Sequence, residues 1–157
     1  MNLYDILAYL AFRASIEDVT LDASADQNGT AFDRNAAGIN SAKSVVLCVS
    51  MGNATGSPTA ETHRVYLQHA QDDGSGSPDA GDWADYDPED GSDIWVTVAG
   101  DGATPQTAVR GYRLDRAKRH LRARYDNANS SFTGGASPDN DFTALLVFGG
   151  GDELPMS

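Results

Sequence analysis

The chain has 157 residues, a size that suits one ordinary domain with a hydrophobic core of its own. Its formal net charge is −12 and its pI is about 4.3. This charge argues against duplex nucleic acid and anionic membranes as partners, because both are bound through Lys and Arg. Sixteen glycines, with many Asp, Ser, Asn and Thr, favour a turn-rich, all-β chain.

The first segment of the chain is apolar. Residues 3–12 place leucine and isoleucine side chains at helical spacing, with two aromatic residues close by. The pattern predicts a short amphipathic helix or arm within residues 1–18. It either covers one end of the core or binds a neighbouring protein. The candidate partner-binding residues of this arm are Leu3, Tyr4, Ile6, Leu7, Leu10 and Phe12.

The next part of the chain, residues 19–148, alternates short β-type segments with turn signals. This spacing predicts a single β-sandwich domain of about eight short antiparallel strands, jelly-roll-like, followed by a flexible tail over residues 149–157. The apolar run "SVVLCVS" predicts the central strand and makes Cys48 a small buried hydrophobe. The predicted strands span residues 19–23, 30–34, 43–51, 62–70, 94–100, 108–114, 119–126 and 142–148.

A long acidic loop over residues 71–93 follows the fourth predicted strand. Asp85, Asp87 and Glu89 alternate in it as calcium ligands do, but the EF-hand pattern fails, so a solvated acidic loop is the favoured interpretation. Trp83 and Tyr86 stand in the same loop. They form either a platform for a sugar or a partner protein, or packing beneath the loop.

The stretch "RGYRLDRAKRHLRARYD", residues 110–126, holds seven of the eleven Lys and Arg residues of the chain. In the predicted strand 119–126, Leu121, Ala123 and Tyr125 fall on one face, and His120, Arg122 and Arg124 on the other. The arginine face can neutralise the acidic loop, within one subunit or between subunits. The arginines predicted to form an interface with a partner or a second subunit are Arg113, Arg116, Arg119, Arg122 and Arg124.

No catalytic motif stands out in the sequence. A nucleophile elbow, a zinc-protease helix motif, a P-loop and a dinucleotide fingerprint are all missing. His63 and His69 stand six residues apart on one predicted strand, too far to share one zinc ion in a regular strand. The sequence therefore predicts a protein that is not an enzyme and that binds no cofactor.

Several stretches, in this order along residues 1–148, resemble a group of tailed-phage virion proteins, the head decoration or cement proteins. The start "MNLYDILAYLAF" with "NGTAFDRNAAGINSAKSVVLCVSMG" is similar to their opening, which has an N–G turn before a hydrophobic strand. "VYLQHAQDDGSG" before "DWADYD" is similar to their strand that ends at a D–D–G turn. "VRGYRLDRAKRHLRARYD" is similar to their Gly–Tyr strand and basic strand. The chain departs from them at His120, where an aromatic residue is usual, and in its enlarged acidic loop.

The resemblance implies a jelly-roll-like β-sandwich on the exterior of the capsid, assembled in the bacterial cytoplasm. It would bind the major capsid protein, form a homotrimer and stabilise the expanded shell, with no active site. Two other functions share this fold class. One is a phage tail or baseplate module. The other is a calcium-dependent carbohydrate-binding or adhesion module with Trp83, Tyr86 and the aspartates of the acidic loop as its site.

Overall fold

The chain forms ten β-strands in the computed structural model, which describes residues 10–22, 24–37, 39–78, 81–86 and 95–150, with only the backbone of Trp95 and Val98. The described residues contain no helix that is long and apolar enough to cross a membrane. The strands are β1 (Ala11–Leu21), β2 (Gln27–Asn28), β3 (Phe32–Asp33), β4 (Ser44–Met51), β5 (Ala60–Ala70), β6 (Ala84–Asp85), β7 (Trp95–Gly100), β8 (Gln106–Arg113), β9 (His120–Thr133) and β10 (Asn140–Gly149).

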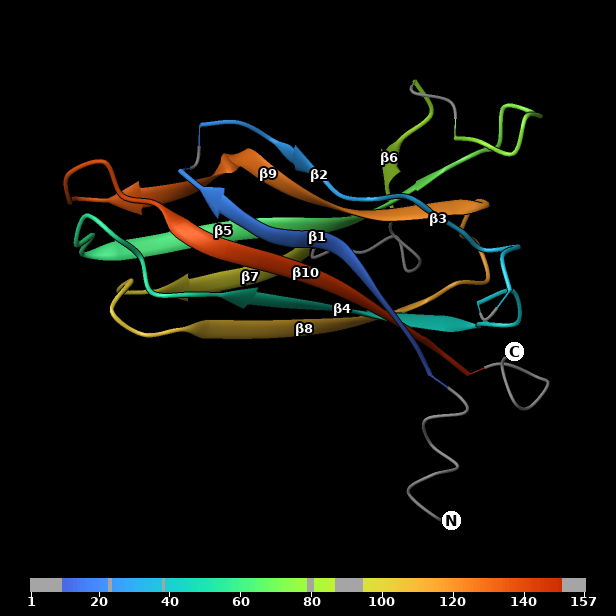
Figure 1. Cartoon of the computed structure of the whole chain (residues 1–157), viewed down its shortest axis with the longest axis horizontal. Coiled ribbons are helices and arrows are strands. Elements are labelled where there is room, and N and C mark those ends of the chain that lie inside the picture. The colour runs from blue at the N-terminus through green and yellow to red at the C-terminus, as the bar shows by residue number, and fades with distance from the viewer. Residues whose placement is uncertain (1–9, 23, 38, 79–80, 87–94, 151–157) are drawn as a thin grey trace, which may run out of the picture.

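The strands form two antiparallel sheets (Figure 1). The first sheet has the order β1-β10-β4-β8. In the second sheet β9 and β5 are central, β2 and β3 pair with the outer edge of β9, and β6 and β7 pair with that of β5. The chain passes from one sheet to the other at most connections. This alternation is that of a jelly roll and confirms the predicted all-β, jelly-roll-like sandwich.

The core lies between the two sheets and is built by simple alternation. Every second residue of β4 and β10 points inward and is buried, and Leu121, Ala123 and Tyr125 of β9 follow the same pattern. In the middle of β5 the residues between the core positions, Tyr66 and Gln68, are buried as well. Because apolar residues occupy the core positions, the sheets pack face to face and exclude water from the space between them. The largest fully buried apolar side chains of the core in the described residues are Tyr86, Tyr125, Phe142, Phe148, Leu21, Leu47, Met51, Leu67, Leu114, Leu121 and Leu146.

The arm or helix predicted over residues 1–18 is wrong for residues 11–18, which belong to strand β1. Strand β1 pairs with β10 along its whole length, and two irregularities of register, between Ala14 and Ile16 and between Ile16 and Val19, interrupt the pairing. These bulges hide the two-residue period of the strand in the sequence. Leu10 and Phe12 are described, whereas Leu3, Tyr4, Ile6 and Leu7 lie outside the described residues.

Strand β9 extends seven residues beyond the predicted end at 126, where Asn- and Ser-rich residues indicated a loop. The extra residues form a bulge in the pairing with β5, between Thr62 and Arg64. Side chains hold the bulge together: the Ser130 hydroxyl donates to the carbonyl of Asp126, 2.6 Å away, and accepts from the amide of Arg64. Polar residues that usually mark a turn therefore stay within a strand, because they satisfy the bulged backbone themselves.

Candidate interaction surface

Strand β9 presents Arg122 and Arg124 on the outer face of the second sheet, as the sequence predicted. His120 lies on the same face, as predicted, because its pairing with Ala70 and the pairing of Arg122 with Gln68 belong to one regular register, but its side chain is buried. Both Asp33 and Ala70 flank it in neighbouring strands, and the carboxylate of Asp72 lies 3.7 Å from its Nε2. The start of the acidic loop therefore covers this end of the strand.

Arg119, just before β9, is held by two carboxylates. Its Nε and Nη2 donate to the two oxygens of Asp33, at 2.9 and 2.7 Å, and its Nη1 contacts Asp72. The bonds from Arg119 lower the pKa of Asp33 to about 2. A two-pronged contact of this kind fixes the orientation of both side chains.

Arg124 is surrounded by three carboxylates. Its Nε and Nη2 donate to Asp26 Oδ2, at 3.1 and 2.8 Å. Asp126 accepts a further bond of 3.3 Å, and Asp85 lies 3.7 Å from Nη1. Asp126 is only 4% exposed, and its carboxylate also accepts from the amide of Ala128 and from Nδ2 of Asn129, so Arg124 is one of three groups that stabilise this buried charge.

Arg122 lies between an amide and an aromatic ring. Its Nε and Nη2 donate to Oε1 of Gln68, at 3.0 and 2.9 Å, and its guanidinium carbon is 4.0 Å from the centroid of the Trp83 ring. Gln68 in turn donates to Asp85, at 2.8 Å. These contacts hold Trp83 and Asp85 of the acidic loop against the outer face of the second sheet.

The predicted neutralisation of arginines by the acidic loop thus occurs within the chain, through Asp72 and Asp85. Two further partners, Asp26 and Asp33, come from segments that the sequence analysis did not single out, because only the pairing of β2 and β3 with β9 brings them near. Arg113 and Arg116 are exposed and belong to β8 and the turn after it. The five arginines therefore do not form one continuous surface.

The calcium and sugar candidates of the acidic loop are only partly described. Asp85 is already bonded to Gln68 and faces Arg124, while Asp87 and Glu89 lie outside the described residues. In the described part of the chain, no three His, Cys, Asp or Glu side chains gather as metal ligands. Tyr86 is buried, with its hydroxyl donating to the carbonyl of Arg113, so its ring is not open to a sugar.

The histidines of β5 are bonded within the fold. His63 is fully buried, with its Nδ1 3.0 Å from the hydroxyl of Tyr125 and its Nε2 3.4 Å from a carboxylate oxygen of Glu61. Burial lowers the pKa of His63, and Glu61 only partly offsets this effect. The Nδ1 of His69 accepts from the amide of Lys118, at 3.2 Å. The two rings therefore serve the packing of the second sheet.

The outer face of the first sheet has a different character. Among the eight residues given next, Phe12 is the one that the sequence predicted to bind a partner. Eight residues in two rows across the four strands are all uncharged, and we call them the apolar face: Phe12, Val147, Val46 and Gly111, then Ala14, Leu145, Cys48 and Val109. Cys48, predicted as a buried hydrophobe, is half-buried here, and burial raises the pKa of its thiol.

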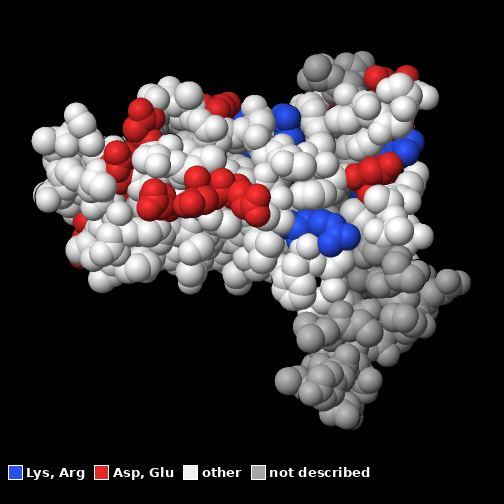
Figure 2. Space-filling view, viewed as in Figure 1, with Lys and Arg blue, Asp and Glu red and all other residues white. Residues whose placement is uncertain are grey.

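A third row across the same face is polar, with Thr143, Ser50 and Thr107. Beside this row stand exposed carboxylates, among them Asp18 on β1 and Asp141 on β10. Figure 2 shows a line of acidic side chains over β1 and β10, whereas the neighbouring surface over β4 and β8 is white. The face of the first sheet is therefore divided into an apolar half and an acidic half.

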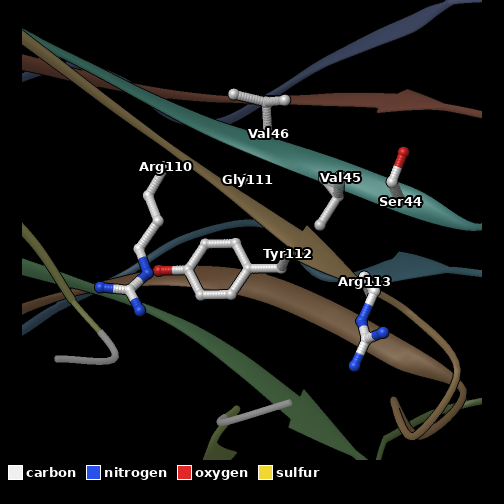
Figure 3. Close-up of a pocket in the computed structure, with 7 residues that line it drawn as sticks. All are labelled: Ser44, Val45, Val46, Arg110, Gly111, Tyr112 and Arg113. Atoms are coloured by element: carbon white, nitrogen blue, oxygen red, sulfur yellow. The ribbon is translucent and has the colours of Figure 1, made fainter. Parts of the chain in front are cut away.

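A shallow hollow of about 340 Å³ lies at the β4–β8 edge of the apolar face. Figure 3 shows Val46 and Ser44 on one side of the sheet, with Val45 and Tyr112 on the other. Gly111 contributes to the hollow because it has no side chain, and a Cβ built there would meet no atom within 4 Å. The hollow is bordered by Arg110, whose guanidinium carbon is 5.5 Å from the centroid of the Tyr112 ring, and by Arg113.

No protein-family model and no curated protein matches the sequence.

Proposed function

We propose that the protein is a structural component of a tailed-phage virion that decorates the outside of the icosahedral capsid. In this role it binds the major capsid protein, stabilises the expanded shell and carries out no chemical reaction. The observation that carries the proposal is the combination of a jelly roll with one apolar outer face on a strongly acidic chain. The resemblance of residues 1–148 to decoration proteins supports the same role.

The distribution of charge supports an exterior location. A shell filled with DNA attracts basic proteins to its contents, whereas a chain of net charge −12 is repelled by them. The arginines that would contact phosphates in a nucleic-acid-binding protein, Arg119, Arg122 and Arg124, are bonded to side chains of their own subunit. They stabilise the fold and leave little positive charge available for DNA.

Decoration proteins occupy symmetric positions on the shell, and we propose a homotrimer for this chain. Around a threefold axis each subunit contact is heterologous and is repeated three times. Because Arg122 and Arg124 already have partners within the subunit, contacts between subunits do not depend on them. Light scattering of the purified protein should then give about three times the mass of one chain, 16.6 kDa.

The copy number of the protein in purified particles tests the proposed function. Quantitative mass spectrometry of virions should give a fixed ratio of this chain to the major capsid protein, with the two in comparable amounts. A copy number in the range of the tail proteins would contradict decoration and would instead identify a tail or baseplate module. The major capsid protein and the portal protein of the same particles serve as internal standards for high and low copy number.

A further inference from the structure

We infer that the apolar face of the first sheet is the surface that docks onto the capsid protein. The partner it fits is a protein surface that presents an apolar strip with basic side chains along one side. This inference rests on the proposed function, because it names the part of the molecule that would contact the shell and leaves the outer face of the second sheet directed away from it.

The pairing of the strands places the eight residues of the apolar face in two adjacent rows. Phe12 pairs with Val147, Val147 with Val46, and Val46 with Gly111 across the sheet. At the two edges of the face, Val109 is 69% and Phe12 is 48% exposed. These two are the exposed large hydrophobic side chains of the described residues. Contiguous apolar surface of this kind on a soluble domain marks an interaction site.

The charges around the apolar face select its partner. The exposed carboxylates of Asp18 and Asp141 stand on one side of the face, beyond the polar row. The basic residues around it are Arg13 at the β1 edge and Arg110 and Arg113 at the β8 edge. On the second sheet, by contrast, Asp26, Asp33 and Asp85 face arginines of their own chain. The first sheet therefore has negative charge that is available to a partner, and basic side chains next to an apolar strip complement it.

The size of the apolar face argues against a second copy of this chain as the occupant. Four strands about 4.8 Å apart and two rows about 7 Å apart give an area on the order of 200–300 Å². A stable interface buries about 800 Å² on each partner. Two copies joined by this face alone fall well short of that area.

The position of the chain ends favours a larger partner surface. Strand β1 begins and β10 ends at the same end of the sandwich, where Ala11 pairs with Phe148 next to the apolar face (Figure 1). Residues 1–9 precede this point, and Leu3, Ile6 and Leu7 among them are apolar. An arm of nine residues spans up to about 30 Å. A partner that contacts the apolar face can therefore also contact the predicted arm, which would add to the area of the interface.

The single cysteine of the chain lies in this surface and provides a direct probe. Cys48 is in the central part of the second row, between Leu145 and Val109. The cysteine is labelled with iodoacetamide, and the extent of alkylation is measured by peptide mass spectrometry. Two samples are compared: the free protein, and the protein bound to expanded, DNA-free shells. The shells are made from the major capsid protein encoded in the same genome. We expect the cysteine to be alkylated in the free protein and to lose its alkylation on the shell.

A matched pair of variants tests the same surface without a label. Val109→Arg adds charge to the apolar face at an exposed position, and Thr97→Arg adds the same charge at an exposed edge-strand position of the second sheet. Both should keep the melting temperature of the parent. We expect Val109→Arg to weaken shell binding by about tenfold or more, and Thr97→Arg to leave it unchanged.

The outcomes separate this inference from the proposed function. If the parent binds shells but Val109→Arg binds equally well and Cys48 is still alkylated on the shell, the inference is overturned and decoration stands. If the parent protein binds no shell, the proposed function fails. If Cys48 is protected from alkylation in concentrated free protein while the mass of the particle in solution doubles, a second copy of this chain covers the apolar face. This result also overturns the inference.

Discussion

The guanidinium of Arg122 lies over the ring of Trp83, with 4.0 Å between the guanidinium carbon and the ring centroid. The two residues are far apart in sequence, and the contact holds the acidic loop against strand β9. Attraction between the cation and the ring, together with the bond from Arg122 to Gln68, offsets repulsion among the carboxylates.

A double-mutant cycle on this pair should give a coupling energy of about 0.5–1 kcal/mol. The cycle compares Arg122→Ala, Trp83→Ala and the double variant by urea-induced unfolding. Removing either partner alone should destabilise the fold, and removing the second should then cost less. Arg113→Ala combined with Trp83→Ala is the matched control, because Arg113 is exposed on β8. Strictly additive effects for Arg122 and Trp83 would contradict the contact.

Gly29 and Gly111 are expected to respond in opposite ways to substitution by alanine. A Cβ at Gly29 would clash with the hydroxyl of Ser15 and lie 2.7 Å from its carbonyl oxygen. Ser15 cannot move easily, because its hydroxyl donates to the carbonyl of Thr30 and accepts from the amide of Ala123. Gly29→Ala should therefore lower the free energy of unfolding by about 1–3 kcal/mol.

Gly111→Ala serves as the control for this experiment. The added methyl group meets nothing within 4 Å, and alanine is less costly to order than glycine in a strand. We expect stability to stay the same or rise by about 0.5 kcal/mol. Chemical denaturation of both variants measures the difference. Equal stability of the two would show that β1 and the β2–β3 segment do not approach as closely as described.

The stability of the protein should fall as the pH is lowered from 7.5 towards 5. Burial keeps the pKa of His63 below its ordinary value of 6.5, so the unfolded chain takes up a proton in this range before the folded chain does. Proton uptake then stabilises the unfolded state, and the free energy of unfolding decreases with falling pH. The carboxylates with lowered pKa, such as Asp33, titrate below this window.

His63→Gln tests this pH dependence. Glutamine stays neutral, so the variant should be less stable than the parent at pH 7.5 but should lose less stability on going to pH 5. His69, whose pKa is also lowered by burial, retains the remaining dependence. Urea unfolding at several pH values measures both proteins. An identical fall in stability for parent and variant would contradict the buried, neutral His63.

The strands with long apolar runs could be predicted from the sequence, and those with bulges could not. Strands β4 and β10 follow the predicted segments 43–51 and 142–148 closely. Strand β1 was not predicted over residues 11–18. Two irregularities in its pairing with β10 shift its apolar residues away from the two-residue period of a regular strand. Short strands such as β2 and β6 form only because they pair with the edge of a long neighbouring strand. Their own sequences show no pattern that predicts a strand.

The candidate surfaces show the same limit. The basic segment predicted that Arg122 and Arg124 share a face, but their partner Asp26 is brought near only by the pairing of β2 with β9. The apolar face had one signal in the sequence: Val46 and Cys48 are apolar although they alternate with the core residues of β4. A strand that is apolar on both faces is either covered on both or exposes one to a partner. The sequence had predicted a strand covered on both faces, with Cys48 buried.

Capsid decoration is tested most directly by co-sedimentation of the purified protein with DNA-free shells of the capsid protein encoded in the same genome. Unexpanded and expanded shells are compared, and the ratio of this protein to capsid protein is measured in the pellet. We expect saturable binding to expanded shells only, at a fixed ratio to the capsid subunits. Binding to neither form would contradict the proposed role in decorating the capsid.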